Sequence, residues 1–357
     1  MPIQTAADSI SNSAGSPYGF KNRIINGAMA IDQRNSGSAT TSTSLWSLDR
    51  WKHYLNTDGA WSIQQSSDAP EGFNNSLKVT ITTADSSLSA SQNGWIAQAI
   101  EGYNWADLNW GTSNAKTITV SFWVKSSVIG TYSAFFLNSA TDRAYVSNYT
   151  INVANTWEYK TITVPGDTTG TWLTTNGTGF YLTFNIASGS NYLGTANTWG
   201  STYLQATSGS VQLINTLNAT WQITGVQVEK GSQATAFDYR PYTTEYQLCQ
   251  RYFWKIKGSD GQYVAVSSGV NTGTTTSRHH FPFQVTMRTA PTVTIGGTFY
   301  CYDGGNLVVT SLSVLPGING ALIDFTGSAG GATSGRGSVG NLGGSSASEF
   351  IQAIAEL

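Results

Sequence analysis

The sequence predicts an all-β protein: an N-terminal arm, an antiparallel jelly-roll β-sandwich, a short linking helix and a small C-terminal β-sandwich. Three stretches, 77–82, 117–124 and 180–186, alternate strictly between apolar and polar residues. This period of two is typical of strands in antiparallel sheets with one buried face. Clusters of Gly, Asn and Ser separate these stretches, as expected for turns. The best helical pattern, 96–110, is interrupted by Gly102 and Asn104, so we expect no long helix.

The chain of 357 residues is long enough for two or three domains. Residues 1–45 are predicted to be an arm or docking segment, because the first 20 or so are small and polar and have little to bury. Residues 46–242 form the jelly roll, and residues 243–357 form the C-terminal β domain. In that domain strands are expected at 263–266, 281–287, 292–295, 307–312, 322–325 and the final residues, with the glycine-rich 327–344 as a surface loop.

The stretch from 221 to 254 joins the two domains. Its apolar alternation changes phase at Gly225, which predicts a β-bulge in a strand over 221–228. Pro241 disfavours helical geometry for the residue before it. We therefore expect the linking helix to follow that proline, over residues 245–251.

Composition limits the classes of partner. Only 11% of the residues are charged and the net charge is −2, which argues against a nucleic-acid-binding surface. The N-terminus lacks the pattern of a signal peptide, and no apolar run approaches the about 18 residues of a membrane span, so we expect no membrane insertion. Cys249 and Cys301 are too few for a disulfide framework and are expected to be buried free thiols. A polar, uncharged, aromatic-rich surface suits contacts with neutral glycans, although any Thr- and Gly-rich β protein has a similar composition.

No motif predicts catalysis, a metal or a cofactor. Residues 335–340 spell G-x-G-x-x-G, but too little chain follows for the βαβ unit of a dinucleotide site. His279 and His280 are adjacent, so on a strand they point to opposite faces and do not share a metal. Asp and Asn residues near turns leave structural Ca²⁺ as an option without demanding it. A glycosidase would need two carboxylates roughly 5 to 10 Å apart; the candidates, most of them at turns, are Asp49, Asp68, Glu71, Glu101, Asp107, Glu158, Asp167, Glu229 and Asp238.

Aromatic residues are the best candidates for a binding site. Trp123 and Tyr181 are predicted on the non-core face of their strands, and other aromatics lie in Gly-, Asn- and Thr-rich segments. An aromatic ring can stack against a sugar while polar neighbours bind its hydroxyls. The alternative is that these rings pack beneath their own loops or against a partner subunit. The candidates for glycan contact or for an interface are Trp95, Trp105, Trp110, Trp123, Trp172, Tyr181, Tyr192, Trp199 and Tyr203.

Several segments resemble tail fibres and receptor-binding proteins of tailed bacteriophages. The main one is ITGVQVEKGSQATAFDYRPY followed by LCQRYF. The others are NRIINGAMAIDQRNSG, SLDRW, SDAPEGFNNSLKV, NTWEYKTITVPGDTTGTW and FPFQVTMRTAPTV. The resemblance implies a jelly roll like that of carbohydrate-binding modules, a homotrimer, and other virion proteins and a host surface glycan as partners.

We therefore expect a structural virion protein, a tail fibre or receptor-binding component that recognises a glycan without catalysis. It would be made in the host cytoplasm and assembled into the virion. The alternative is a capsid decoration or vertex protein that makes protein–protein contacts only. A third possibility is a glycan depolymerase, which needs the carboxylate pair.

Overall fold

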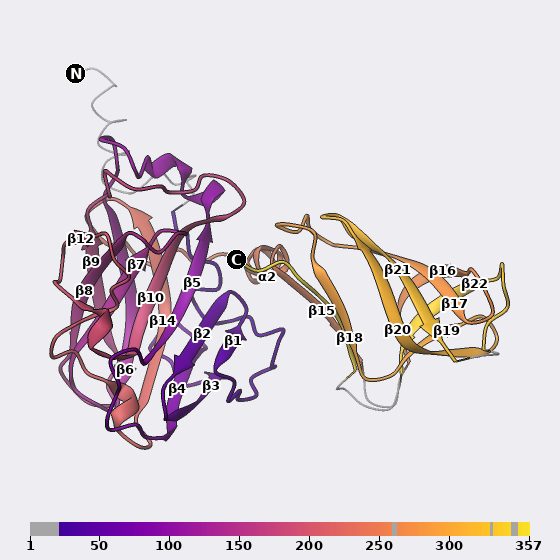
Figure 1. Cartoon of the computed structure of the whole chain (residues 1–357), viewed down its shortest axis with the longest axis horizontal. Helices are drawn as coiled ribbons and strands as arrows, with labels where there is room; N and C mark the ends of the chain where they lie inside the picture. Colours follow the sequence, from indigo (N-terminus) through magenta and orange to yellow (C-terminus); the bar gives the residue numbers. More distant parts are fainter. Residues whose placement is uncertain (1–20, 259–262, 329–330, 344–348) are drawn as a thin grey trace. The chain divides into compact units, whose positions relative to one another are not determined.

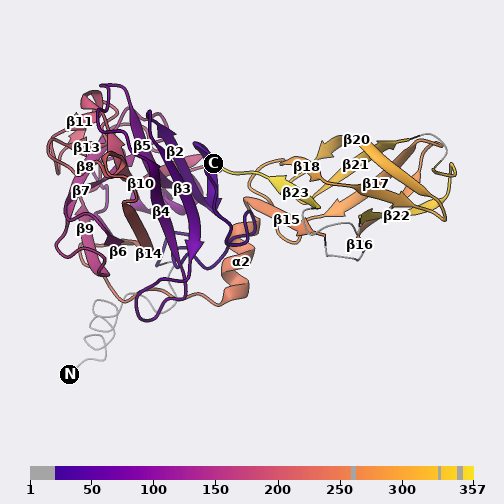
Figure 2. The same cartoon turned by 90° about the horizontal axis from the view of Figure 1, so that it is seen from below.

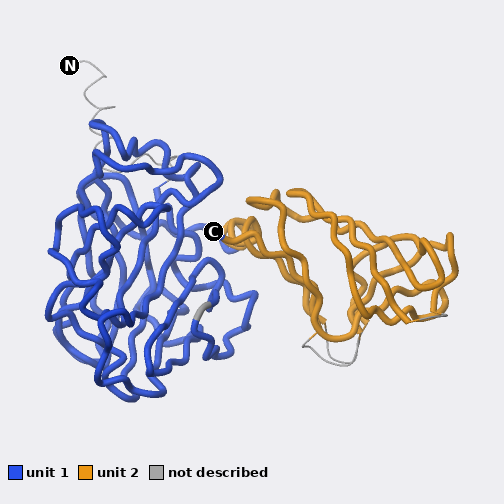
Figure 3. Tube along the Cα trace, viewed as in Figure 1, with its two compact units in different colours: residues 1–242, 357 blue, residues 243–356 orange. Residues whose placement is uncertain are grey.

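A computed structural model describes residues 21–258, 263–328, 331–343 and 349–357. The chain divides into two compact units, residues 1–242 with 357 (unit 1) and residues 243–356 (unit 2), shown separately in Figure 3. The division falls after Tyr242. Among the described residues, no helix is both long and apolar enough to cross a membrane.

Unit 1 is a sandwich of two antiparallel sheets (Figures 1 and 2). The larger sheet has seven strands, in spatial order β1 (Ser44–Leu48), β2 (Trp51–Asn56), β5 (Asn93–Glu101), β10 (Thr178–Ser188), β7 (Gly130–Leu137), β8 (Ala144–Ile151) and β12 (Trp199–Gly200). The smaller has five, in order β3 (Ala60–Ser66), β4 (Ser76–Thr83), β14 (Thr220–Lys230), β6 (Ile118–Ser126) and β9 (Glu158–Val164). A short parallel pair, β11 (Leu193–Gly194) and β13 (Ala206–Thr207), lies in a connecting segment. The predicted all-β sandwich is confirmed.

The core of unit 1 lies between the two sheets, where the three predicted alternations place their apolar residues. Leu77, Val79 and Ile81 on β4 are completely buried, while Lys78 and Thr80 between them are only half-buried. The inward apolar residues of β6 and β10 are also completely buried, but most of the polar residues that alternate with them, such as Thr119, Ser121 and Asn185, are buried as well. The best helical pattern becomes strand β5 followed by two single 3₁₀ turns, Gly102–Asn104 and Ala106–Leu108.

The bulge at Gly225 is confirmed. The pairing of β14 with β6 shifts register between Thr224 and Gln227, and Gly225 has a φ of +62°. A Cβ atom at this position would lie 2.7 Å from a ring carbon of Phe73. Both the positive φ and the close approach require glycine here.

Residues 21–45 are not a separate arm, which corrects the boundary expected from sequence. Ile24 and Met29 are completely buried in the sandwich core. Asn26 Nδ2 donates to the Asp49 carbonyl oxygen (2.9 Å), and Arg240 donates to the carbonyl oxygen of Ile24 (3.0 Å). These few apolar residues are enough to anchor the segment because each is inserted whole into the core. The predicted arm over residues 1–20 lies outside the described residues.

Helix α2 (Tyr242–Gln250) leads into unit 2 and confirms the linking helix, which begins directly after Pro241. Unit 2 contains a three-stranded sheet, β15 (Phe253–Lys257), β23 (Phe350–Ile354) and β18 (Thr292–Gly296). The rest closes into a barrel of β16 (Val264–Asn271), β17 (Thr276–Pro282), β21 (Gly320–Gly327), β20 (Asn306–Pro316), β19 (Phe299–Tyr302) and β22 (Gly337–Leu342). The expected small β domain is therefore present, with a barrel in place of two open sheets.

Two details of unit 2 differ from the prediction. The strand expected over 281–287 ends at Pro282, which lacks the N–H needed to continue the ladder. Part of the glycine-rich stretch is barrel strand β22 and not a surface loop. A Cβ atom at Gly340 would lie 2.3 Å from Ser267 Oγ, so glycine lets this strand pack closely. Cys249 and Cys301 are both free and buried, as predicted.

Candidate functional site

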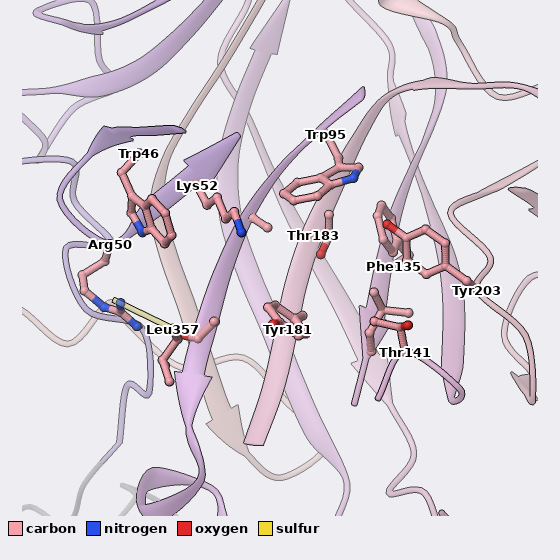
Figure 4. A pocket seen from close by; sticks show the side chains of 13 residues that line it. Trp46, Arg50, Lys52, Trp95, Phe135, Thr141, Tyr181, Thr183, Tyr203 and Leu357 are labelled. Atoms are coloured by element: carbon pink, nitrogen blue, oxygen red, sulfur yellow. Dashed lines mark hydrogen bonds between the residues drawn. The ribbon is translucent and has the colours of Figure 1, made fainter. Parts of the chain in front are cut away.

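The outer face of the seven-stranded sheet carries a pocket with a volume of about 160 Å³ (Figure 4). Residues on this face alternate with the core residues of the same strands, because successive side chains of a strand point to opposite sides. The pocket spans the adjacent strands β1, β2, β5, β10 and β7. It is lined by Trp46, Arg50, Lys52, Trp95, Ala97, Ala99, Phe135, Leu137, Thr141, Tyr181, Thr183, Tyr203 and Leu357.

Small side chains on the middle strand create the hollow. Ala97 and Ala99 lie on β5, and their partners across β10 are Thr183 and Tyr181. Ala97 is also paired with Lys52 on β2. The larger neighbours on each side rise above the two methyl groups, so the alanines form the floor and the neighbours form the walls.

One wall is aromatic and held in place by its surroundings. The Trp95 ring stacks on Tyr54 with 5.5 Å between ring centroids, and Tyr203 meets Phe135 edge to face at 6.3 Å. The segment that carries Tyr203 is anchored by the buried Gln205, whose backbone N–H donates to the Tyr192 carbonyl oxygen (2.8 Å). Burial raises the pKa of Tyr203 to about 12. Its hydroxyl is therefore protonated at neutral pH and can donate a hydrogen bond.

The opposite end of the pocket is basic. Figure 4 shows Trp46, Arg50 and Lys52 on one side of the pocket and Phe135, Thr141 and Tyr203 on the other. Lys52 Nζ lies 5.0 Å from the centroid of the Trp46 ring. The Arg50 guanidinium is buried and donates to the carbonyl oxygen of Ala99 (2.5 Å). The pocket thus runs from a cationic end to an aromatic and hydroxyl-bearing end.

Three of the residues predicted from sequence meet in this pocket: Trp95, Tyr181 and Tyr203. Tyr192 is half-buried and borders the pocket through an edge-to-face contact with Tyr203 at 5.7 Å. Trp123 lies on the outer face of the other sheet, where it packs against Tyr159 at 5.4 Å.

Trp105, Trp110 and Trp172 are buried, and the structure corrects their assignment as candidate contacts. Trp105 stacks on Phe180 with 4.1 Å between ring centroids, and Trp110 meets Trp172 edge to face at 4.7 Å. Trp199 is half-buried at the rim of this cluster, 5.5 Å from Trp172. The 3₁₀ turns after β5 place Trp105 and Trp110 in the core, and Trp172 reaches them from the segment between β9 and β10.

Sequence reasoning missed the basic end of the pocket and part of its walls. Thr183 has the same strand parity as Tyr181, so the alternation of β10 was sufficient to predict its outward position. Phe135 lies in a run of apolar residues without alternation, so the sequence does not show which face of the sheet its side chain points to. Trp46 and Lys52 come from strands whose neighbour in the sheet, β5, is distant in sequence. No local signal links them to Trp95.

None of the candidate carboxylates lines the pocket, and most of them have structural partners. Asp107 and Asp167 each receive two hydrogen bonds from one arginine, Arg23 and Arg143 respectively. Buried Glu229 accepts from the backbone N–H (2.8 Å) and the hydroxyl (2.7 Å) of Thr235. The pairs Asp68–Lys125 and Glu158–Lys160 are also ion pairs. In the part of the chain that the structure describes, no three His, Cys, Asp or Glu side chains are grouped to hold a metal.

Unit 2 contains a buried histidine inside its barrel. His279 Nδ1 lies 2.9 Å from Ser267 Oγ, and its Nε2 lies 2.9 Å from Ser277 Oγ and 3.0 Å from Ser338 Oγ. Burial lowers the pKa of His279 to about 4, so the ring is neutral at pH 7. His280 is exposed on the other face of β17, as the prediction for adjacent histidines required.

Neither a protein-family model nor a curated protein sequence matches this chain. Among solved structures it is similar to the enzymatically active domain of tailspike protein 4 of bacteriophage CBA120 (12% identity, TM-score 0.33, 59% of this chain and 21% of that one). It is also similar to TmCBM61 in complex with β-1,4-galactotriose (11% identity, TM-score 0.30, 59% of this chain and 99% of that one). A third similar structure is the family 11 carbohydrate-binding module of Lic26A-Cel5E from Clostridium thermocellum (13% identity, TM-score 0.28, 56% of this chain and 98% of that one). The chain spans about a fifth of the tailspike domain, and all three likenesses are distant.

Proposed function

We propose that this chain is a non-catalytic glycan-binding protein of a phage virion, a tail fibre or receptor-binding component that recognises a host surface glycan. The observation that carries glycan binding is the pocket on the outer face of the seven-stranded sheet, which combines aromatic rings, hydroxyl groups and a small apolar floor. This mixture is typical of ligand sites that hold a molecule with both apolar and polar faces. The place in the virion is supported by the sequence resemblance to phage fibres.

Binding would use stacking and hydrogen bonds. A sugar ring placed against Trp95 presents its C–H face to the indole, whose orientation is held by Tyr54. The hydroxyls of Tyr181, Thr183 and Tyr203 line the same pocket and can exchange hydrogen bonds with ring hydroxyls. Glycoside hydrolysis needs two carboxylates near the bond, and no side-chain carboxylate lines the pocket within the described sandwich.

The resemblance to phage fibres also implies a homotrimer. Three copies of one weak site acting on the same cell surface raise the overall avidity without any new contact. A shallow pocket of about 160 Å³ is compatible with such a weak individual site.

The experiment is a binding measurement on a panel of bacterial surface polysaccharides with wild-type protein and two variants. Trp95→Ala is expected to weaken binding about 3- to 10-fold per site, the equivalent of roughly 0.5–1.5 kcal/mol for an aromatic contact. The matched control is Tyr159→Ala, an exposed ring on the other sheet. Failure of the wild type to bind any polysaccharide, or equal losses in the two variants, would overturn the proposal.

A second candidate is a capsid decoration or vertex protein, and the outer face of the five-stranded sheet favours it. There Trp123 packs on Tyr159. Next to them, Phe73 contacts Phe237 and Tyr239 at 5.1 and 5.5 Å. Tyr159 and Tyr239 are exposed and the other three rings are half-buried. Partly exposed aromatic groups of this kind often anchor protein–protein interfaces.

The position of the chain on the intact particle distinguishes the two candidates. We would locate it by cryo-EM or with a gold-labelled antibody against residues 46–242. Labelling at the tail supports receptor binding. Labelling across the capsid supports the decoration role and assigns the aromatic row on the five-stranded sheet to assembly.

A further inference from the structure

The floor of the pocket is too narrow for the sugar ring that would stack on Trp95. Ala97 and Ala99 form this floor, and only 3% and 8% of their surfaces are exposed. Contact areas this small admit a substituent the size of a methyl group, whereas a six-membered sugar ring stays above them. The floor is therefore the part of the pocket that responds to a substituent on the sugar.

Pairing across the sheet determines what surrounds Ala97. Its direct neighbours are Lys52 on β2 and Thr183 on β10, and the Cβ atoms of directly opposite residues are about 4.5–5.5 Å apart. Trp95 lies two residues earlier on β5 and so points to the same face of the sheet. All three side chains are larger than alanine, so Ala97 lies at the bottom of a hollow that has the indole ring as one wall.

The bottom of the hollow is apolar. Strand β5 has a hydrogen-bonded strand on each side, so its backbone N–H and C=O groups are engaged in the two ladders. Beyond Thr183, its β7 partner Phe135 belongs to a buried apolar cluster against which Trp95 and Tyr203 pack. Polar groups such as the Thr183 hydroxyl therefore stand on the walls of the hollow and not on its floor.

This lining distinguishes a methyl group from a hydroxyl group. A sugar hydroxyl on the floor would exchange its contacts with water for the methyl groups of Ala97 and Ala99, which costs binding free energy. A methyl group has no hydrogen bonds to lose, and its burial stabilises the complex in proportion to the apolar area removed from water. The hollow therefore selects between sugars that differ at one small substituent.

We propose that the sugar bound in this pocket carries a methyl group that fills the hollow over Ala97 and Ala99 while the sugar ring lies against Trp95. This inference rests on the proposed function and narrows its ligand. Leu357 lies beside Arg50, away from Trp95 (Figure 4), so the hollow is at the other end of the pocket. Sugars supply such a methyl group in two ways, as an acetyl group or as the C6 methyl of a 6-deoxy sugar.

The test presents bacterial surface polysaccharides in matched forms. Each acetylated polysaccharide is immobilised native, after mild alkaline removal of its O-acetyl groups, and after replacement of its N-acetyl groups by N-formyl groups. Binding to polysaccharides with 6-deoxy sugars is competed with free L-rhamnose against L-mannose and with L-fucose against L-galactose. We expect the wild-type chain to favour the methyl-bearing member of one comparison about fourfold, the effect of burying one methyl group. The comparison that shows the preference identifies the source of the methyl group.

Protein variants connect the preference to the floor. Ala97→Val fills the hollow and is expected to remove the fourfold preference. Ala97→Ser keeps the size of the side chain and adds a hydroxyl partner, so it should reduce the preference even if the valine variant loses its native circular dichroism spectrum. Ala60→Val, at a half-buried alanine on β3 in the other sheet, is the matched control and should keep the wild-type preference.

The outcomes separate this inference from the function on which it rests. Equal binding of the wild type to both members of every comparison, or binding only to polysaccharides without acetyl groups and 6-deoxy sugars, overturns the methyl group and leaves glycan binding standing. An unchanged preference in folded Ala97→Val and in Ala97→Ser overturns its placement over this floor. Absence of binding to every polysaccharide overturns the proposed function itself.

Discussion

Acidification is expected to destabilise the barrel of unit 2 through His279. The side chain is completely buried among hydroxyl groups, and burial lowers its pKa from 6.5 to about 4. The unfolded chain binds a proton at this histidine as the pH falls through about 6.5, whereas the folded barrel does so only near pH 4. The contribution of His279 to stability is therefore complete above pH 6.5 and decreases as the pH falls from 6.5 to 4.

The magnitude follows from the size of the shift. One pKa unit corresponds to about 1.36 kcal/mol, so the difference between 6.5 and about 4 corresponds to at most about 3 kcal/mol. This is a large part of the roughly 5–15 kcal/mol that stabilises a typical domain. Protonation of the aspartate carboxylates in the barrel affects its stability mainly at lower pH, because the ordinary pKa of aspartate is near 3.9.

Hydrogen–deuterium exchange of the whole chain, followed by mass spectrometry at pH 7.0 and 4.5, measures the effect. Peptides from β16, β17 and β22 should lose protection at pH 4.5 after correction for the intrinsic rate. The His279→Gln variant, which keeps a polar side chain but cannot titrate, should lose this pH dependence, and the exposed His280→Gln should retain it. Equal protection of the wild-type barrel at both pH values would refute the reasoning.

Three further predictions concern packing. Trp105→Ala should destabilise unit 1 by about 3–5 kcal/mol, measured by urea unfolding, because the ring is buried in its stack with Phe180; a loss below 1 kcal/mol would contradict its place in the core. Gly340→Val should destabilise the barrel, since a Cβ atom would lie 2.3 Å from Ser267 Oγ and 3.0 Å from a ring carbon of the buried Phe299; a native circular dichroism spectrum and melting temperature would count against this. The Cys301 thiol, whose pKa burial raises to about 12, should resist iodoacetamide at pH 8 in the folded protein and react on unfolding; rapid native labelling would show that it is accessible.

The sequence was informative where a strand has one buried face. The alternation around Leu77, Val120 and Phe184 predicted strands β4, β6 and β10, because burial on one side imposes a period of two. The phase change at Gly225 predicted its bulge for the same reason. Closure of unit 2 into a barrel was not predictable in this way, since closure depends on how strands distant in sequence pair.

The candidate site was only partly predictable. Trp95 and Trp105 are both aromatic residues close to the same strand, yet one lines a pocket and the other lies in the core. Their difference arises from the tertiary position of the turns after β5, which no local pattern records. Lys52 reaches Trp95 only because β2 and β5 are neighbours in the sheet.

The residues of β5 that shape the pocket are different from the residues of β5 that pack the core. Ala97 and Ala99 point away from the main core, while Ile96 and Ile100 on the same strand point into it. Larger or smaller side chains at the two outward positions would reshape the pocket while the sheet keeps the packing that holds it together. A single substitution at Ala97 or Ala99 would therefore change the shape of the pocket while Ile96 and Ile100 keep their places in the core.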